Sequence, residues 1–212
     1  MYKKMFFLFC FVFSQSFALT LEQVKSSLKE NFIPKDSAEL QLRVTVKTVA
    51  STSLTDMHIV NKGPNKSYME IRSSLLNQRS IINGDRMKII DLATREYKII
   101  AYNGEVLKDY SYGDFNPLDS GKWSAPKYVS QEWYLIEGEA GSLYYNSKYK
   151  RVEKIHAIKN NADVLTTFEY DANNKLRKMI VSVEVNGKET TVITEIFKMR
   201  NSKDFPDRLF EF

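Results

Sequence analysis

Cysteine is almost absent from this sequence. The 212 residues hold one cysteine, Cys10, together with only two histidines. A single cysteine cannot form a disulfide within the chain, so the fold must depend on its core. His58 and His156 stand far apart and have no neighbour at the spacing of metal ligands. We therefore favour a structural or exposed role for both histidines and expect no bound metal.

Sequence motifs of enzyme active sites are also missing. There is no glycine-rich phosphate loop, no G-x-S-x-G nucleophile motif and no histidine–glutamate zinc motif. The carboxylates are scattered as on solvated strand faces, and Glu137 and Glu139, which flank Gly138, are explained as alternate strand residues or turn residues. We expect no catalytic residue and no cofactor, and a hydrolase that uses scattered carboxylates is an alternative that nothing in the sequence supports.

The first 18 residues have the three parts of a cleavable secretory signal peptide. Lys3 and Lys4 precede the apolar run MFFLFCFVF at residues 5–13, and Ser16-x-Ala18 has the small-x-small form that a signal peptidase recognises. The run is about half the ~20 residues that a membrane-spanning helix needs. We expect cleavage near Ala18, which places the protein outside the cytoplasm.

Cys10 lies inside this apolar run and follows Phe9, so we interpret it as part of the signal peptide and not as a lipid anchor. Cleavage then leaves a chain with no cysteine. It also removes Lys3 and Lys4 and lowers the net charge from +5 to +3. Because no cluster of lysine and arginine stands out, we expect no nucleic-acid partner.

Residues 19–212 have the pattern of one domain. A capping box at Thr20 and Gln23 predicts a helix over residues 20–32, which Pro34 ends. From Glu39 onward, apolar and polar residues alternate, with turn signals such as Asn83-Gly84 every eight to twelve residues. The pattern predicts an α+β fold: one N-terminal helix followed by about eleven antiparallel strands that close toward a barrel or half-barrel.

The segment 105–131 interrupts this alternation. It holds Pro117, Pro126 and several aromatic residues, and at most a short helix is expected near Pro117-Leu118. A loop of this length in a compact domain is usually functional or mobile.

Several weak motifs occur in a characteristic order along the chain. They are the helix and strand at 19–32 and 39–49, the segments 62–71, 81–85 and 89–91, and the closing segments 168–171, 176–179, 186–187, 196–197, 205–207 and 209–210. In this order they resemble the periplasmic outer-membrane lipoprotein carriers, the LolA-like family, over nearly all of 19–212. The family often has an arginine near the second group, where this chain has Lys62 and Gly63.

The resemblance implies an open antiparallel half-barrel whose helices form a lid over an apolar cavity, and in this chain the segment 105–131 would supply the lid. It implies a monomeric periplasmic carrier of acylated lipoproteins or lipids between the inner and outer membranes. An inner-membrane lipoprotein-releasing ABC transporter and an outer-membrane acceptor would be its partners. Such a carrier has a physical purpose, since exposing an acyl chain to water costs about 0.8 kcal/mol per CH₂.

One face of the early strands is the expected cavity wall. Methionine adapts to apolar ligands of variable shape, although it also fills irregular cores. The candidate ligand-binding residues are Leu42, Val44, Met57, Ile59, Met69, Ile71, Ile82, Met87, Ile89 and Ile99, with Trp123 and Trp133 near the mouth. A register error of one residue would move a whole strand's set to the other face.

Two other binding functions remain open from the sequence. The same half-barrel is found in proteins similar to a periplasmic regulator of envelope stress, which senses lipoprotein and binds an anti-sigma factor. Those proteins usually carry a second C-terminal domain, for which 19–212 leaves no room. A carrier of another lipid is the other alternative.

Overall fold

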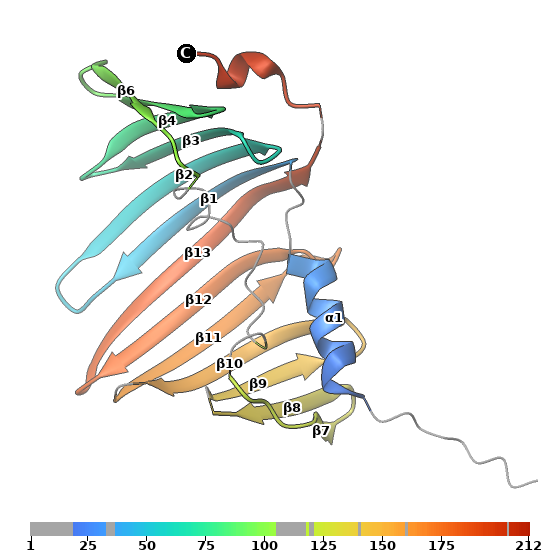
Figure 1. The fold of residues 1–212 in the computed structure, drawn as a ribbon. Coiled ribbons are helices and arrows are strands. Elements are labelled where there is room, and N and C mark those ends of the chain that lie inside the picture. The colour runs from blue at the N-terminus through green and yellow to red at the C-terminus, as the bar shows by residue number, and fades with distance from the viewer. Residues whose placement is uncertain are drawn as a thin grey trace, which may run out of the picture.

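A computed structural model describes residues 19–32, 37–104, 118, 121–139, 141–159, 161–202 and 204–212. The predicted signal peptide at 1–18 lies outside the described residues, as does most of the predicted lid at 105–131. The described residues form one helix, one short 3₁₀ helix and a single antiparallel sheet (Figure 1). The predicted half-barrel with an N-terminal helix is therefore confirmed.

The sheet has thirteen strands in the described part of the chain, where the sequence predicted about eleven. They are β1 (Ser37–Lys47), β2 (Thr52–Lys62), β3 (Lys66–Ser73), β4 (Asn77–Asn83), β5 (Arg86–Asp91), β6 (Tyr97–Ala101), β7 (Lys127–Ser130), β8 (Trp133–Gly138), β9 (Gly141–Asn146), β10 (Arg151–Lys159), β11 (Ala162–Tyr170), β12 (Leu176–Val185) and β13 (Lys188–Asn201). β7 falls inside the segment that was expected to be an irregular lid.

The strand order is β6-β5-β4-β3-β2-β1-β13-β12-β11-β10-β9-β8-β7. Every neighbour is also the next strand in the chain, except at the centre, where β1 pairs with β13. The first and last long strands thus join two meanders, and β6 and β7 form the two edges (Figure 1). Long-range pairing at this junction is what makes the two halves one sheet.

Helix α1 (Leu21–Phe32) packs on one face of the sheet, which we call the inner face. Its capping box is formed as predicted, with the Thr20 amide donating to Gln23 and the Gln23 amide donating to the Thr20 hydroxyl. Val24 and Leu28 are fully buried, and they join the largest core cluster, to which β8–β11 contribute Ile136, Leu143, Tyr145, Val152 and Phe168. This contact fixes the helix over one half of the sheet.

The other face, which we call the outer face, carries the C-terminal segment. The 3₁₀ helix η2 (Asp207–Phe210) places Phe210 against Val60 and Ile81, and Phe205 joins the same cluster. Lys62 Nζ donates to the Phe205 carbonyl at 2.8 Å and to Asp207 Oδ1 at 3.0 Å. The C-terminal segment is therefore anchored on the opposite side of the sheet from α1.

Gly141 begins β9 at a position where no side chain fits. Its φ is +136°, and a Cβ there would lie 2.1 Å from the His156 carbonyl oxygen of β10. We expect Gly141→Ala to lower the free energy of unfolding by about 3 kcal/mol, because backbone must move to admit the methyl group.

Gly84→Ala is the matched control in urea unfolding, since its φ is +67° but nothing lies within 4 Å of its Cβ position. That variant should lose only about 1 kcal/mol, from backbone strain alone. Equal losses in the two variants would show that the close approach at Gly141 has no energetic effect.

Candidate ligand-binding face

All five methionines of residues 19–212 lie on the inner face. The cross-strand register aligns Leu40 with Met199 and Ile59, and Ile59 in turn with Met69. The same register places Met57 opposite Leu42, Met87 opposite Ile82, and Met179 opposite Thr194, next to Val44. Because strand side chains alternate between faces, these methionines share one surface with the neighbouring branched residues. The inner face is thus apolar and adaptable.

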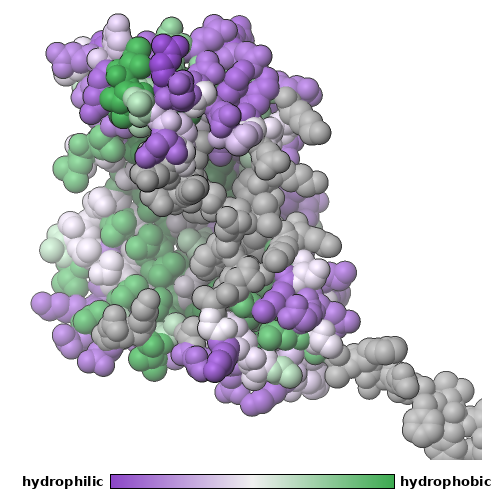
Figure 2. Space-filling view, viewed as in Figure 1, coloured by the Kyte–Doolittle hydropathy of each residue, from purple (hydrophilic) through white to green (hydrophobic). Residues whose placement is uncertain are grey.

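Nine of the predicted ligand-binding residues are brought together on this face. Pairing in continuous register from β1 to β5 places them there: Leu42, Val44, Met57, Ile59, Met69, Ile71, Ile82, Met87 and Ile89. Leu42 and Ile59 belong to a buried cluster, against which Met57 and Met69 pack. Apolar residues are visible within the hollow of the sheet in Figure 2.

Ile99 is not part of this set. It pairs with Lys88, whereas its neighbour Ile100 pairs with Met87 and shares the inner face. The side chain of Ile99 is 46% exposed on the outer face. The candidate position on β6 is therefore Ile100.

The two tryptophans lie in the other half of the sheet. Trp123 forms an isolated bridge with Gly138 and packs against the core cluster under α1. Trp133 begins β8 and pairs with Asn146, so it alternates with Tyr134 and lies toward the outer face. The structure therefore separates both tryptophans from the nine residues above.

The register adds inner-face residues that the sequence did not assign. They come from β12, β13 and β1: Met179, Val181, Val192, Ile196, Met199 and Leu40. Their alternation was visible in the sequence, but their position beside β1 depends on a strand pairing across more than 150 residues. The inner face is therefore continuous across the junction of the two meanders.

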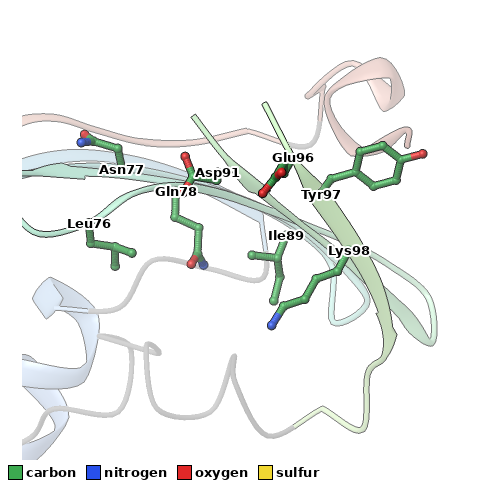
Figure 3. Close-up of a pocket in the computed structure, with 8 residues that line it drawn as sticks. All are labelled: Leu76, Asn77, Gln78, Ile89, Asp91, Glu96, Tyr97 and Lys98. Carbon is green, nitrogen blue, oxygen red and sulfur yellow. The ribbon is translucent and has the colours of Figure 1, made fainter. Parts of the chain in front are cut away.

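A cavity of about 290 Å³ lies at the β4–β6 end of the sheet. It is lined by Leu76, Asn77, Gln78, Ile89, Asp91, Glu96, Tyr97 and Lys98. In Figure 3, Gln78, Ile89 and Lys98 point to the side on which α1 lies, as expected from the pairing of Ile89 with Lys98. The apolar inner face thus ends in a partly polar pocket with one ammonium group.

A second cavity, of about 350 Å³, has a mostly polar lining. Arg43 donates to both carboxylate oxygens of Asp56, at 2.7 and 3.1 Å, and the Arg43 guanidinium lies over the Phe197 ring. His58 and Arg72 also line it. Because its charges are already paired, this cavity is a poor match for an apolar chain.

A buried carboxylate ties the two meanders together on the outer face. Glu39 of β1 accepts hydrogen bonds from Lys198 at 2.9 Å, from Arg200 at 2.6 Å and from His58 at 3.1 Å. Burial alone would raise the pKa of Glu39, but these bonds outweigh it and lower the pKa to about 2. The ionised carboxylate therefore stabilises the β1–β13 junction.

Glu70 of β3 is a second carboxylate on the outer face, and its side chain is 13% exposed. It accepts hydrogen bonds from the Tyr68 hydroxyl, Arg72 and Arg79 at 2.7 Å each. Burial opposes ionisation, but these donors lower the pKa of Glu70 to about 2. Burial and this bond also raise the pKa of Tyr68 to about 12.

These depressed pKa values predict acid lability. The folded-state pKa of Glu39 lies below its usual 4.5, so its stabilisation is present at neutral pH and is lost as the pH falls from 4.5 toward 2. We expect a loss on the order of 2–3 kcal/mol from this group. Glu39→Gln should flatten the dependence of unfolding free energy on pH in that window, measured by urea unfolding. An unchanged slope would contradict the role of Glu39.

Among the described residues, no group of three His, Cys, Asp or Glu side chains is placed to hold a metal ion. The described part of the chain also contains no helix with the length and apolar character to cross a bilayer. The chemistry that the inner face offers is contact with apolar groups, with polar atoms at one end.

The sheet topology and the apolar residues of the inner face together define an open antiparallel half-barrel with an apolar inner surface. A LolA superfamily protein from Nitrosomonas europaea has this fold, with a TM-score of 0.57 at 14% identity over 92% of this chain and 99% of that one. No model of a known family and no curated protein matches the sequence. The chain therefore has the fold of LolA superfamily proteins, as the sequence motifs predicted.

Two further solved structures are more distant. One is a domain provisionally named an outer membrane lipoprotein-sorting protein, from Vibrio parahaemolyticus, with a TM-score of 0.49 at 12% identity over 89% of this chain and 94% of that one. The other is a DUF1329 family protein from Desulfovibrio piger, with a TM-score of 0.37 at 11% identity over 90% and 96%. The fold assignment rests on the Nitrosomonas protein.

Proposed function

We propose that this protein is a periplasmic carrier that binds acyl chains on its inner face and shuttles lipoproteins from the inner to the outer membrane. The observation that carries the proposal is the gathering of all five methionines of 19–212 on one face of an open sheet. Flexible thioether side chains suit a ligand whose apolar part varies in shape.

The arrangement of the face supports this role. Leu42, Ile59, Met57 and Met69 form one apolar cluster that continues across the junction into Ile196. A surface of this kind can take up methylene groups, each of which gains about 0.8 kcal/mol on leaving water. Lys98, beside the cavity at the β4–β6 end, is a partner for the polar end of a bound lipid.

The similarity in fold supports the same class of function, because the Nitrosomonas europaea protein that has this fold is a LolA superfamily protein. One difference concerns release. The family arginine is replaced by Lys62 and Gly63, and Lys62 bonds to the C-terminal segment on the outer face. The resemblance implies that this arginine acts on the lid and on release, and we propose that unloading in this chain does not depend on a guanidinium group at that position.

Displacement of a fluorescent fatty acid tests acyl-chain binding. The purified protein should enhance the fluorescence of the probe, and an acylated lipoprotein peptide should displace it while its unacylated form does not. Displacement by free lipid alone would favour a carrier of another lipid. No binding of the probe and no acylated molecule released on extraction of the purified protein would contradict the carrier function.

A pull-down from periplasmic extract and solubilised membranes tests shuttling. Recovery of an inner-membrane transporter complex and an outer-membrane acceptor would support transfer between membranes. Recovery of an anti-sigma factor would instead favour the envelope-stress sensor that the sequence left open.

A further inference from the structure

Exposed aliphatic side chains gather at one end of the sheet. Four successive hairpins, β3–β4, β1–β2, β12–β13 and β10–β11, turn at this end and lie along the left side of Figure 1. They carry Leu75, Val49, Val185 and Ile158, with exposed fractions of 94%, 84%, 40% and 70%. We call these four residues the apolar rim.

The rim is regularly spaced. In the sheet order, each of these hairpins is two strands from the next. Because neighbouring strands lie about 4.8 Å apart, successive tips are roughly 10 Å apart and the row extends over about 30 Å. Exposed apolar side chains scattered singly need no explanation, but a row on four consecutive hairpins does.

The turns at the opposite end of the same sheet are polar. They present Gly63-Pro64-Asn65, Asn83-Gly84-Asp85 and residues 171–175. The turn between β9 and β10 carries Tyr149, whose ring lies under Lys148 and Arg151. The apolar rim is therefore a property of these four hairpins, because the next turn at the same end, between β5 and β6, carries Arg95 and Glu96.

The backbone at two rim turns is already hydrogen-bonded within the turn. The Thr48 hydroxyl accepts from the amides of Ala50 and Ser51, beside Val49. The Ser73 hydroxyl accepts from the amides of Leu75 and Leu76, at 3.2 and 2.9 Å. Because burying an unpaired amide is costly, turns closed in this way can leave water at low cost.

The rim turns are also uncharged. Residues 48–51, 74–76 and 186–187 contain no ionisable side chain, and Asn161 is the described residue of the β10–β11 turn. The charged residues beside the turns belong to the adjoining strands: Lys47, Lys159, Asp163, Glu184 and Lys188. Charged side chains are what opposes entry into a bilayer. Aliphatic tips on turns without ionisable residues, two of which have their amides already hydrogen-bonded, therefore match the interfacial zone of a membrane.

We propose that the apolar rim docks the protein on a lipid bilayer, with the side chains of Leu75, Val49, Val185 and Ile158 inserted among the lipids. A protein partner would need a continuous patch of about 800 Å² on this chain. Separate tips spread over about 30 Å do not provide one, whereas lipids close around each tip individually. Docking at this end presents the edge of the inner face to the membrane.

Co-sedimentation with vesicles tests docking. The probe is vesicles of phosphatidylethanolamine and phosphatidylglycerol, and binding should persist at high salt because the rim is uncharged. Val49→Ser, Leu75→Ser and Ile158→Ser combined should raise the apparent dissociation constant roughly tenfold or more. The three side chains are largely exposed, so the melting temperature should stay unchanged.

Ile99→Ser with Val129→Ser is the matched control, because these exposed aliphatic residues lie on the two edge strands, away from the rim. That variant should bind vesicles as the wild type does. The proposal is overturned if the rim variant also binds as the wild type, if salt abolishes binding, or if the rim variant loses a protein partner but not vesicles. The assay uses no acyl probe, so its failure leaves the proposed acyl-chain binding standing.

Discussion

Met57→Gln combined with Met69→Gln should weaken binding of an acyl-chain probe roughly 30-fold, or about 1 kcal/mol for each side chain. Both side chains pack in the inner-face cluster with Leu42 and Ile59. Glutamine matches methionine in length but brings an amide that an acyl chain cannot hydrogen-bond. The measurement is a fluorescence titration of the bound probe.

The control for this variant is the same change on the other face. Ile180 and Ile193 pair with each other on β12 and β13, and Ile193 pairs with Thr45, so both lie on the outer face. Ile180→Gln with Ile193→Gln should leave the affinity for the probe within about twofold of the wild type. Equal loss of affinity in the two variants would show that the inner face is not the binding surface.

Leu28→Ala should lower the free energy of unfolding by about 3 kcal/mol, because its side chain is 1% exposed and fills the contact between α1 and the sheet. Urea unfolding measures the loss. Glu22→Ala is the control on the exposed side of the same helix and should change stability by less than about 0.5 kcal/mol. A loss below about 1 kcal/mol for Leu28→Ala would mean that α1 is not held by this contact.

The faces of the first five strands could be predicted from alternation alone. A period of two fixes which residues of a strand share a side, and Asn83-Gly84 joins β4 to β5 by a two-residue turn that carries this assignment across the hairpin. Ile82 and Met87 therefore fall on the same face, as the sequence indicated. The prediction failed at β6, where Ile99 was expected on the inner face and Ile100 lies there instead. The length of the turn between Asp91 and Glu96 does not determine which residues of β6 share a face with those of β5.

The second half of the inner face could not be predicted. The pairing of β1 with β13 depends on residues far apart in sequence, and a register shift between Gln41 and Leu42 places Phe197 out of the regular alternation. No local pattern therefore indicates which residues lie beside Met179 and Met199 in the sheet. β7 was missed because Pro126 and the nearby aromatic residues obscured a strand of only four residues.

The buried charged groups could not be predicted from the sequence either. In the sequence, Glu39 is the polar residue next to Leu40 in an alternating strand, and polar residues at such positions are usually exposed to solvent. Its cations, Lys198 and Arg200, come from the far end of the chain and reach it only when β13 pairs with β1. The pairing of β1 with β13, which no local sequence pattern indicates, therefore makes Glu39 a structural carboxylate and not a surface one.

Photo-cross-linking with a fatty acid that carries a diazirine along its chain tests the central claim most directly. After irradiation, proteolysis and mass spectrometry locate the labelled residues. The account predicts labels on inner-face residues such as Met57, Met69 and Met199, and their loss when unlabelled acylated peptide is added in excess. Labels confined to outer-face residues such as Tyr68 or Ile180, or spread equally over both faces, would contradict it.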